Sequence, residues 1–265
     1  TLGGNAGEVL VGLTLRPGTP GQNAALVYLL PPDGERPTIA AELRVGDLRV
    51  ELARCGATCR AADVELRGGE RLEVRVPDVG GTRGGTAAFD LPALPAADGA
   101  DLLGRARRRM RALRSYRVDE WLGPAGVPGV PRVYSALAYR APDRMRLEVD
   151  NGFQRVWVGD TRYARDRADA PWRVEGVGPQ IAVPRFDWDG EVVGARVVGR
   201  GEVDGTATEI VAFFTRVGRS PAWFRLWVDA DGLVRRSGMG TESAHFMEDR
   251  FRDFDAPFTI EAPVP

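Results

Sequence analysis

Hydrophobic and polar residues alternate with a period of two over most of the chain, which is typical of β-strands whose two faces meet different surroundings. Between residues 8 and 91 the alternating stretches are short, and turn clusters rich in Gly and Pro separate them. These stretches are EVLVGLTLR, AALVYLL, LRVELA, DVEL, RLEVRV and TAAFDL. About six or seven short strands with such turns predict an immunoglobulin-like β-sandwich over residues 1–92.

A single helical pattern follows the predicted sandwich. Two prolines precede it, and we assign residues 93–98 to a linker. At about 100° per residue, the apolar side chains of residues 100–113 share one arc of the helix surface: Leu102, Leu103, Ala106, Met110 and Leu113. Arginines occupy the remaining surface, which would also suit a helix lying on an anionic membrane. The narrow apolar stripe favours a helix that docks on a sheet and leaves its arginines in solvent.

From residue 116 to the end, the period of two returns in longer stretches. Short turns such as APDR and DADG connect them, so we expect antiparallel neighbours. About nine or ten strands with one face rich in large apolar groups must curl and bury that face. The sequence therefore predicts a mostly β chain, with a second domain over residues 99–265.

The second domain carries a family resemblance. The segments LRSY, YRAPDRMRLE, VWVGDTRYARDRADAPW, FRLWVDADGLVRRSGM and HFMEDRFRDFDAPFTI resemble the LolA-like fold of lipoprotein carriers and their mycobacterial lipoprotein relatives. The resemblance covers about residues 98–265. It implies a curved antiparallel half-barrel with an N-terminal helix, which shelters a hydrophobic cavity for acyl chains.

The first domain carries a second resemblance. LTLRPGTPGQNAALVYLLPPDG, followed by a short sandwich, is similar to the extracytoplasmic domain of membrane proteins of the copper-resistance D (copper transport) family. That likeness implies a position at the outer face of the cytoplasmic membrane or in the periplasm. The chain has no apolar run long enough to span a membrane and does not begin with Met, so we expect an excised piece of a membrane-anchored protein.

Cys55 and Cys59 are the two cysteines of the chain. The sequence on either side alternates like two antiparallel strands, which can bring the cysteine Cα atoms within disulfide range. A disulfide suits an exported domain, and closing so small a loop would stabilise the fold by about 2 kcal/mol. A Cu(I) site made of two thiolates and a redox pair remain alternatives.

Apolar faces in the second domain suggest a ligand site. Alternation places Leu137 with Tyr139, Met145 with Leu147, Ile210 with Phe214, and Phe224 with Leu226 and Val228 on common faces. If the half-barrel is open, these residues line a cleft for a lipid, an acyl chain or another apolar ligand. If it is filled, they form the core.

Met239, His245 and Met247 form the second candidate site. Thioether and imidazole groups suit copper, and His245 and Met247 share a face if that stretch is a strand. Both residue types also occur in ordinary folded interiors, and that structural role is favoured here. We therefore predict no cofactor, with copper as the alternative.

Composition excludes several classes of function. The chain has no Lys and one His, so P-loop, Schiff-base and multi-histidine zinc chemistry are absent, and a net charge of −1 gives no pull toward nucleic acid. We predict a non-catalytic extracytoplasmic binding module for an apolar ligand or a lipid-modified partner. A copper-handling ectodomain, or a structural or sensory ectodomain that contacts a membrane-protein partner, is the alternative.

Overall fold

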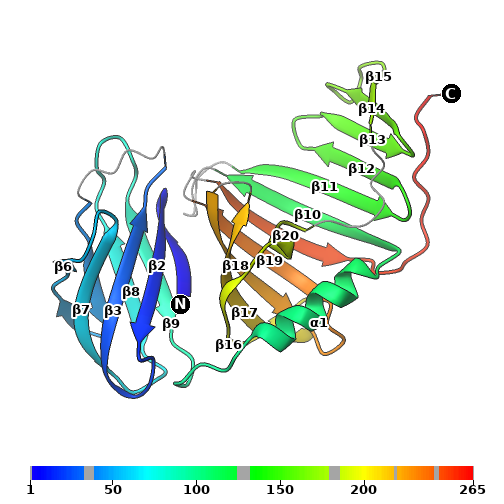
Figure 1. Cartoon of the computed structure of the whole chain (residues 1–265). Helices are drawn as coiled ribbons and strands as arrows, with labels where there is room; N and C mark the ends of the chain where they lie inside the picture. Colours follow the sequence, from blue (N-terminus) through cyan, green and yellow to red (C-terminus); the bar gives the residue numbers. More distant parts are fainter. Residues whose placement is uncertain are drawn as a thin grey trace.

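The computed structural model describes residues 2–32, 39–123, 132–178, 186–217, 220–241 and 245–264. Figure 1 shows two β-rich parts, a sandwich in blue and cyan and a large curved sheet in green to red, with helix α1 (Ala100–Arg111) after the sandwich. The curved sheet is open, because β15 and β16 form its two edges. The mostly β fold and the position of the helix confirm the predicted fold class.

The sandwich consists of two antiparallel sheets. One has the order β1-β2-β3-β7-β6 and the other β5-β4-β8-β9. Their strands are β1 (Leu2–Ala6), β2 (Val9–Arg16), β3 (Gly21–Leu30), β4 (Glu42–Val45), β5 (Leu48–Val50), β6 (Ala53–Arg54), β7 (Cys59–Leu66), β8 (Arg71–Val76) and β9 (Gly85–Asp90). Alternate side chains of both sheets meet in one core, in which Leu13, Val27 and Leu72 are fully buried. Period-two patterning thus explains this part directly.

The predicted strand over residues 48–53 is wrong. The chain leaves one sheet after β5, which pairs with β4, and enters the other at β6, which pairs with β7. Cys55 directly follows β6 and Cys59 is the first residue of β7, and the two cysteines form a disulfide across a Cα–Cα distance of 5.0 Å. The disulfide prediction is therefore confirmed, and it occupies both thiols.

Eleven antiparallel strands build the curved sheet. Their order is β15-β14-β13-β12-β11-β10-β20-β19-β18-β17-β16. The bounds are β10 (Ser115–Gly123), β11 (Val133–Arg140), β12 (Arg144–Val149), β13 (Gln154–Val158), β14 (Thr161–Arg165), β15 (Arg173–Val177), β16 (Val193–Val203), β17 (Thr206–Val217), β18 (Ser220–Val228), β19 (Val234–Thr241) and β20 (Phe246–Arg252). Between β16 and β17, Asp204 and Gly205 both have positive φ, as a two-residue type I′ hairpin turn requires.

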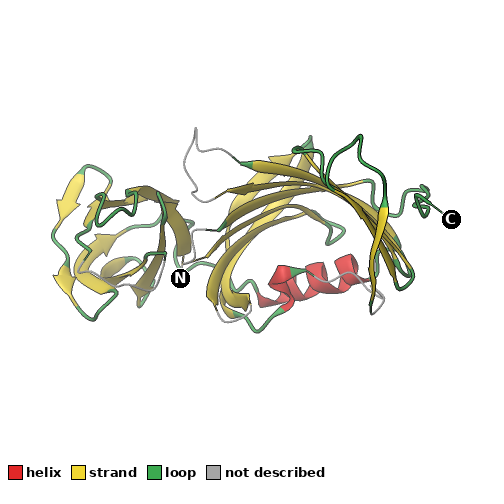
Figure 2. Ribbon diagram, turned by 90° about the horizontal axis from the view of Figure 1, so that it is seen from above, coloured by secondary structure: helices red, strands yellow, loops and turns green. Residues whose placement is uncertain are grey.

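Helix α1 lies within the curve of the sheet, as Figure 2 shows from above. The predicted apolar stripe is the buried face, since Leu102, Leu103, Ala106 and Met110 are at most 4 % exposed. They pack in one core with side chains from the concave face of the sheet, including Phe224. Among the described residues, no helix combines the length and the apolar character of a membrane span.

The first strand of the sandwich packs on the convex face of the curved sheet. A Cβ atom added at Gly3 would lie 2.1 Å from the Trp223 ring, so the indole occupies the place of a side chain. At Gly12, an added Cβ would lie 3.5 Å from the ring of Phe214. The alternation pattern did not predict β1, because LGGNA has little β-propensity. Close packing against Trp223 favours glycine there instead.

The predicted linker also contacts the curved sheet. The backbone N–H of Val197 donates to the carbonyl of Ala97 at 2.9 Å, and the N–H of Gly99 donates to the carbonyl of Ala195 at 3.1 Å. These bonds attach residues 97–99 to the edge strand β16. The connection between the two parts is therefore fixed along the sheet edge, and α1 begins directly after it.

We expect Phe224→Ala to lower the free energy of unfolding of the curved sheet by about 3–5 kcal/mol, because it leaves a cavity between α1 and the sheet. All six tryptophans belong to this part, so their fluorescence during urea unfolding measures it selectively. The control is Val193→Ala at a side chain that is 66 % exposed, which should change the stability by less than about 0.5 kcal/mol. Equal losses in the two variants would contradict the assigned core.

Candidate ligand cleft on the concave face

A cleft lies on the concave face of the curved sheet, beside the region that α1 fills. Its volume is about 130 Å³. Apolar and aromatic side chains dominate its wall, with three acids among them. The lining residues are Tyr116, Val118, Glu120, Leu137, Tyr139, Met145, Phe186, Asp187, Trp188, Met247, Asp249 and Phe251.

Strand register explains how these side chains meet. Val118 of β10 pairs with Leu137 of β11 and with Phe251 of β20, so all three project to the same face. Tyr139 of β11 in turn pairs with Met145 of β12. The wall of the cleft therefore comes from four neighbouring strands whose inward positions are apolar.

A short segment after the sheet's outer strands closes the cleft. Phe186 and Trp188, at the helical turn η1 (Asp187–Asp189), stack with ring centroids 4.6 Å apart and with planes at 8°. The guanidinium of Arg107 on α1 donates to the carbonyls of Trp188 and Gly190, the latter at 2.8 Å. Arg111 forms an ion pair with Asp189 at 3.0 Å. The prediction that the arginines of the helix all face solvent is thus wrong for Arg107, which is half-buried against η1, whereas Arg111 is exposed while it pairs with Asp189.

Acidic side chains in this apolar setting are the unusual feature of the cleft. Asp249 is only 5 % exposed, and its Oδ2 accepts a hydrogen bond from the Ser237 hydroxyl at 2.7 Å. Burial, and then the nearby charges of Glu120 and Asp187, raise the pKa of Asp249 to about 8. Burial also raises the pKa values of Glu120 and Asp187. At neutral pH the carboxyl of Asp249 is therefore mostly protonated and can donate a hydrogen bond.

Three buried polar atoms of the cleft have no partner within the described protein. They are Oδ1 of Asp249, the hydroxyl of Tyr139 and Nε1 of Trp188, and the last two residues are at most 2 % exposed. Buried polar groups are nearly always hydrogen-bonded, so each such group calls for an explanation. All three residues belong to the lining of the cleft.

The structure places three of the predicted ligand residues on the cleft wall: Leu137, Tyr139 and Met145. Leu147 is half-buried on the same strand as Met145 but outside the lining. Phe224, Leu226 and Val228 are at most 1 % exposed and pack in the core with α1. The half-barrel is thus filled under the helix and hollow beside it.

The prediction that Ile210 and Phe214 belong to the ligand wall is wrong. Ile210 pairs with Trp227 on the convex face, and Phe214 lies against Gly12 of the sandwich. The neighbouring Phe213 points to the core instead. Alternation could not assign these faces, because β17 is apolar at both parities where the sandwich and α1 cover it from opposite sides.

Sequence reasoning missed the three acids, although two of them carried a signal. Glu120 shares its parity with Val118, and Asp249 shares its parity with Met247 and Phe251. A charged residue at an inward position between apolar ones indicates a site rather than a surface. Asp187 lies in a turn, for which periodicity gives no direction.

The predicted copper ligands are only partly brought together. Met239 and Met247 are cross-strand partners in β19 and β20, and His245 is an exposed residue just before β20. In the part of the chain that the structure describes, no group of three or more His, Cys, Asp or Glu side chains is placed to hold a metal ion. Copper binding by these residues stays a prediction.

Comparison with known proteins gives matches among solved structures. No family model matches the chain, and neither does any curated protein. The lipoprotein LppX of Mycobacterium tuberculosis is 15 % identical over 61 % of this chain and 97 % of its own length, with a TM-score of 0.46. LprF of Mycobacterium bovis is 14 % identical, covering 62 % of this chain and 95 % of its own, also with a TM-score of 0.46.

A LolA superfamily protein of Nitrosomonas europaea is a third structural neighbour. It is 8 % identical over 62 % of this chain and 96 % of its own length, with a TM-score of 0.29. None of these three is a copper-resistance D protein, and that resemblance stays a prediction.

The buried acid predicts a pH-dependent stability. Because the folded pKa of Asp249 lies above that of the unfolded chain, the folded state binds the extra proton between about pH 4 and pH 8. The stability that the Asp249 carboxyl contributes is full below about pH 4. It falls as the pH rises, by up to about 1.4 kcal/mol per pH unit. We expect Asp249→Asn to flatten this fall, as measured by urea unfolding at pH 5, 6, 7 and 8.

Asp166→Asn is the matched control for this measurement. Hydrogen bonding to Arg173 lowers the pKa of the exposed Asp166, so the stability that this carboxyl contributes is lost only as the pH falls below about 4. The control should therefore keep the wild-type slope above pH 5. Parallel curves for wild type and Asp249→Asn would show that Asp249 is ionised in the folded protein.

Proposed function

We propose that this protein is a non-catalytic binding module that takes an apolar ligand, an acyl chain or a lipid-modified partner, in the concave cleft. The observation that carries the proposal is the pairing of an apolar aromatic wall with buried polar atoms that lack partners, Asp249 Oδ1 and the Tyr139 hydroxyl. Ligand pockets for apolar molecules have this composition, with a few polar groups that fix orientation.

The chemistry of the cleft suggests which end of the ligand it holds. An ionised carboxylate would repel a fatty acid, whereas the protonated Asp249 can donate to a carbonyl oxygen. The Tyr139 hydroxyl can donate as well. An ester or a carboxylic acid, with its chain against Leu137 and Met145, would satisfy these groups. A volume of about 130 Å³ suits one segment of a chain rather than a whole lipid.

The placement of the protein belongs to the same proposal. A module of this kind would act outside the cytoplasm, in the periplasm or at the outer face of the membrane, where lipids and lipidated proteins are accessible. The disulfide between Cys55 and Cys59 supports this placement, because disulfides persist in oxidising compartments. Attachment to a membrane protein of the copper-resistance D family would provide the anchor.

The binding test uses a fluorescent C18 polyene fatty acid titrated into the purified chain. Met145→Trp places a larger side chain on the cleft wall, and we expect roughly tenfold weaker binding. The control is Val174→Trp on β15, which adds the same ring at a position that is 59 % exposed. Equal affinity in the two variants would place the fatty acid elsewhere on the protein.

Native mass spectrometry, without and with Cu(I), separates this proposal from its alternatives. A lipid-sized adduct that departs on denaturation supports the proposal. One copper ion that is lost in Met239→Leu and Met247→Leu would instead favour copper handling. A bare mass in both conditions, with no saturable fatty-acid binding, would leave an ectodomain that contacts another protein.

A further inference from the structure

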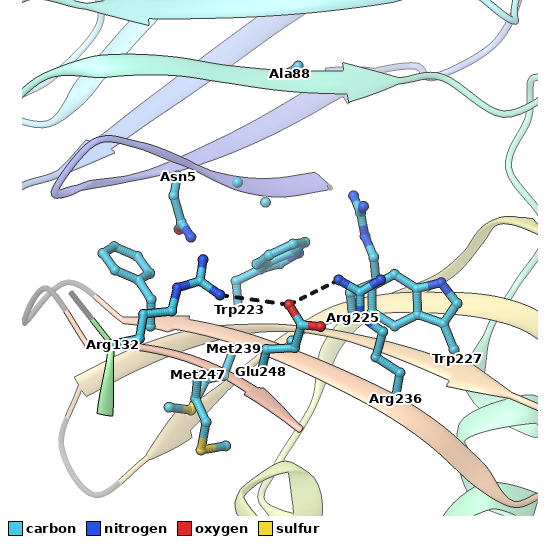
Figure 3. Close-up of a pocket in the computed structure, with 14 residues that line it drawn as sticks. Asn5, Ala88, Arg132, Trp223, Arg225, Trp227, Arg236, Met239, Met247 and Glu248 are labelled. Carbon is cyan, nitrogen blue, oxygen red and sulfur yellow. Dashed lines mark ion pairs between the residues drawn. The ribbon is translucent and has the colours of Figure 1, made fainter. Parts of the chain in front are cut away.

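A second hollow lies on the convex face of the curved sheet, where the sandwich meets it. Its volume is about 340 Å³. β1 supplies one side through Gly3, Gly4 and Asn5, and β18, β19 and β20 supply most of the other. Figure 3 shows three arginine side chains among the tryptophan rings of this pocket, with Asn5 above them. We call it the interdomain pocket.

Arginines and tryptophans alternate along the floor of the pocket. The guanidinium of Arg225 lies 5.1 Å from the ring centroid of Trp223 and 5.9 Å from that of Trp227. The guanidinium of Arg236, on β19, lies 4.4 Å from the ring centroid of Trp227 on β18. The rings hold the two guanidinium groups in place, and their N–H groups point outward in the plane of each guanidinium, where they can donate.

Positive charge exceeds negative charge in this pocket. Glu248 is its one acidic lining residue, and it is shared by Arg236 at 3.1 Å and Arg132 at 3.9 Å, as the dashed lines in Figure 3 show. Arg250, just outside the lining, contacts the same carboxylate at 3.6 Å. Arg225 forms no ion pair with any residue that the structure describes.

Because Arg225 is partly buried, the absence of an ion-pair partner in the described part of the chain is energetically unfavourable. Burial, and then the charge of Arg236, lower the pKa of Arg225, which the more distant Asp90 only partly offsets. A cation that has lost hydration is stabilised by an anion at hydrogen-bond distance. The pocket is large enough to admit one.

Three buried N–H groups in the pocket have no acceptor among the described residues. They are Nε of Arg225, Nε of Arg236 and Nε1 of Trp223. All three are donors, so an acceptor with several oxygen atoms would complement them. Oδ1 of Asn5 is a fourth buried atom of this lining without a partner among the described residues, and it is an acceptor. A neutral hydroxyl or amide could accept hydrogen bonds from the three donors, but only an anion would also balance the excess positive charge.

We propose that the interdomain pocket binds an oxyanion of the phosphate class between Arg225, Arg236 and Trp223. Phosphate oxygens match the planar guanidinium donors, and the walls of both domains shield the pair from water. The phosphate could belong to a lipid headgroup or to a small soluble molecule, since both present the same oxygens. Because β1 forms part of the wall, bound anion would also join the two domains more firmly.

Isothermal titration with inorganic phosphate at constant ionic strength is the first test, on the full chain. Arg225→Gln should weaken binding roughly tenfold, by removing the unpaired cation. Arg173→Gln is the control, because it removes the same charge from the exposed strand β15, far along the sheet. Equal weakening in the two variants would mean that net charge alone attracts phosphate, and would overturn the site.

Glu248→Gln gives a test that misfolding cannot imitate. Removing the one carboxylate of the lining frees Arg236 and Arg132, so we expect phosphate to bind severalfold more tightly. Unchanged or weaker binding would show that the arginines and tryptophans only hold the domains together, and would overturn the proposal.

Vesicle flotation distinguishes the two sources of the phosphate group. If the ligand is an anionic headgroup, the wild type should float with vesicles of phosphatidylglycerol but not with vesicles of phosphatidylcholine. The Arg225→Gln variant should float with neither. Saturable phosphate binding without retention on vesicles assigns a small soluble ligand. If the protein shows neither saturable phosphate binding nor retention on the vesicles, the oxyanion site is refuted. Both tests are independent of fatty-acid binding in the concave cleft.

Discussion

The centre of the curved sheet is covered on both of its faces, and the arrangement of the whole molecule depends on this constraint. On β18, Phe224 points to α1 and Trp223 points to the sandwich, and both are buried. A strand in this situation must be apolar at both parities. The helix can then fill only part of the concave face, which leaves the cleft beside it, and the sandwich covers only part of the convex face, which leaves the interdomain pocket.

The sequence predicted those elements whose two faces differ clearly. Helix α1 and its buried stripe were predicted to within two residues of the observed end, because arginines mark its opposite side. The inward positions of β11 and β12 were recognised for the same reason. The prediction was wrong at Ile210 and Phe214, where the sandwich covers the face that would otherwise meet water. It also missed β1, where the ring of Trp223 from the curved sheet takes the place of a side chain at Gly3.

Polar groups of the two hollows differ in how far the sequence reveals them. Asp249 stands at an inward position between apolar neighbours, so the pattern itself marks it as unusual. Arg225 lies between two tryptophans on a strand, which also fits an ordinary surface ladder. Only the position of the sandwich shows that Arg225 is shielded from water without a carboxylate among the described residues as an ion-pair partner. Burial between the sandwich and the curved sheet is a property of tertiary structure and leaves no period in the sequence.

Strand β20 separates the two hollows, since Asp249 and Phe251 line the concave cleft while Phe246 and Glu248 line the interdomain pocket. Successive side chains of a strand point to opposite faces, so inserting or deleting one residue in β20 would exchange the two sets. The buried acid would then lie among the arginines, and the ion-pairing glutamate would enter the apolar wall. Natural variation in this strand is therefore expected to proceed by substitution at constant length, whereas insertions should accumulate in the connections on either side of it.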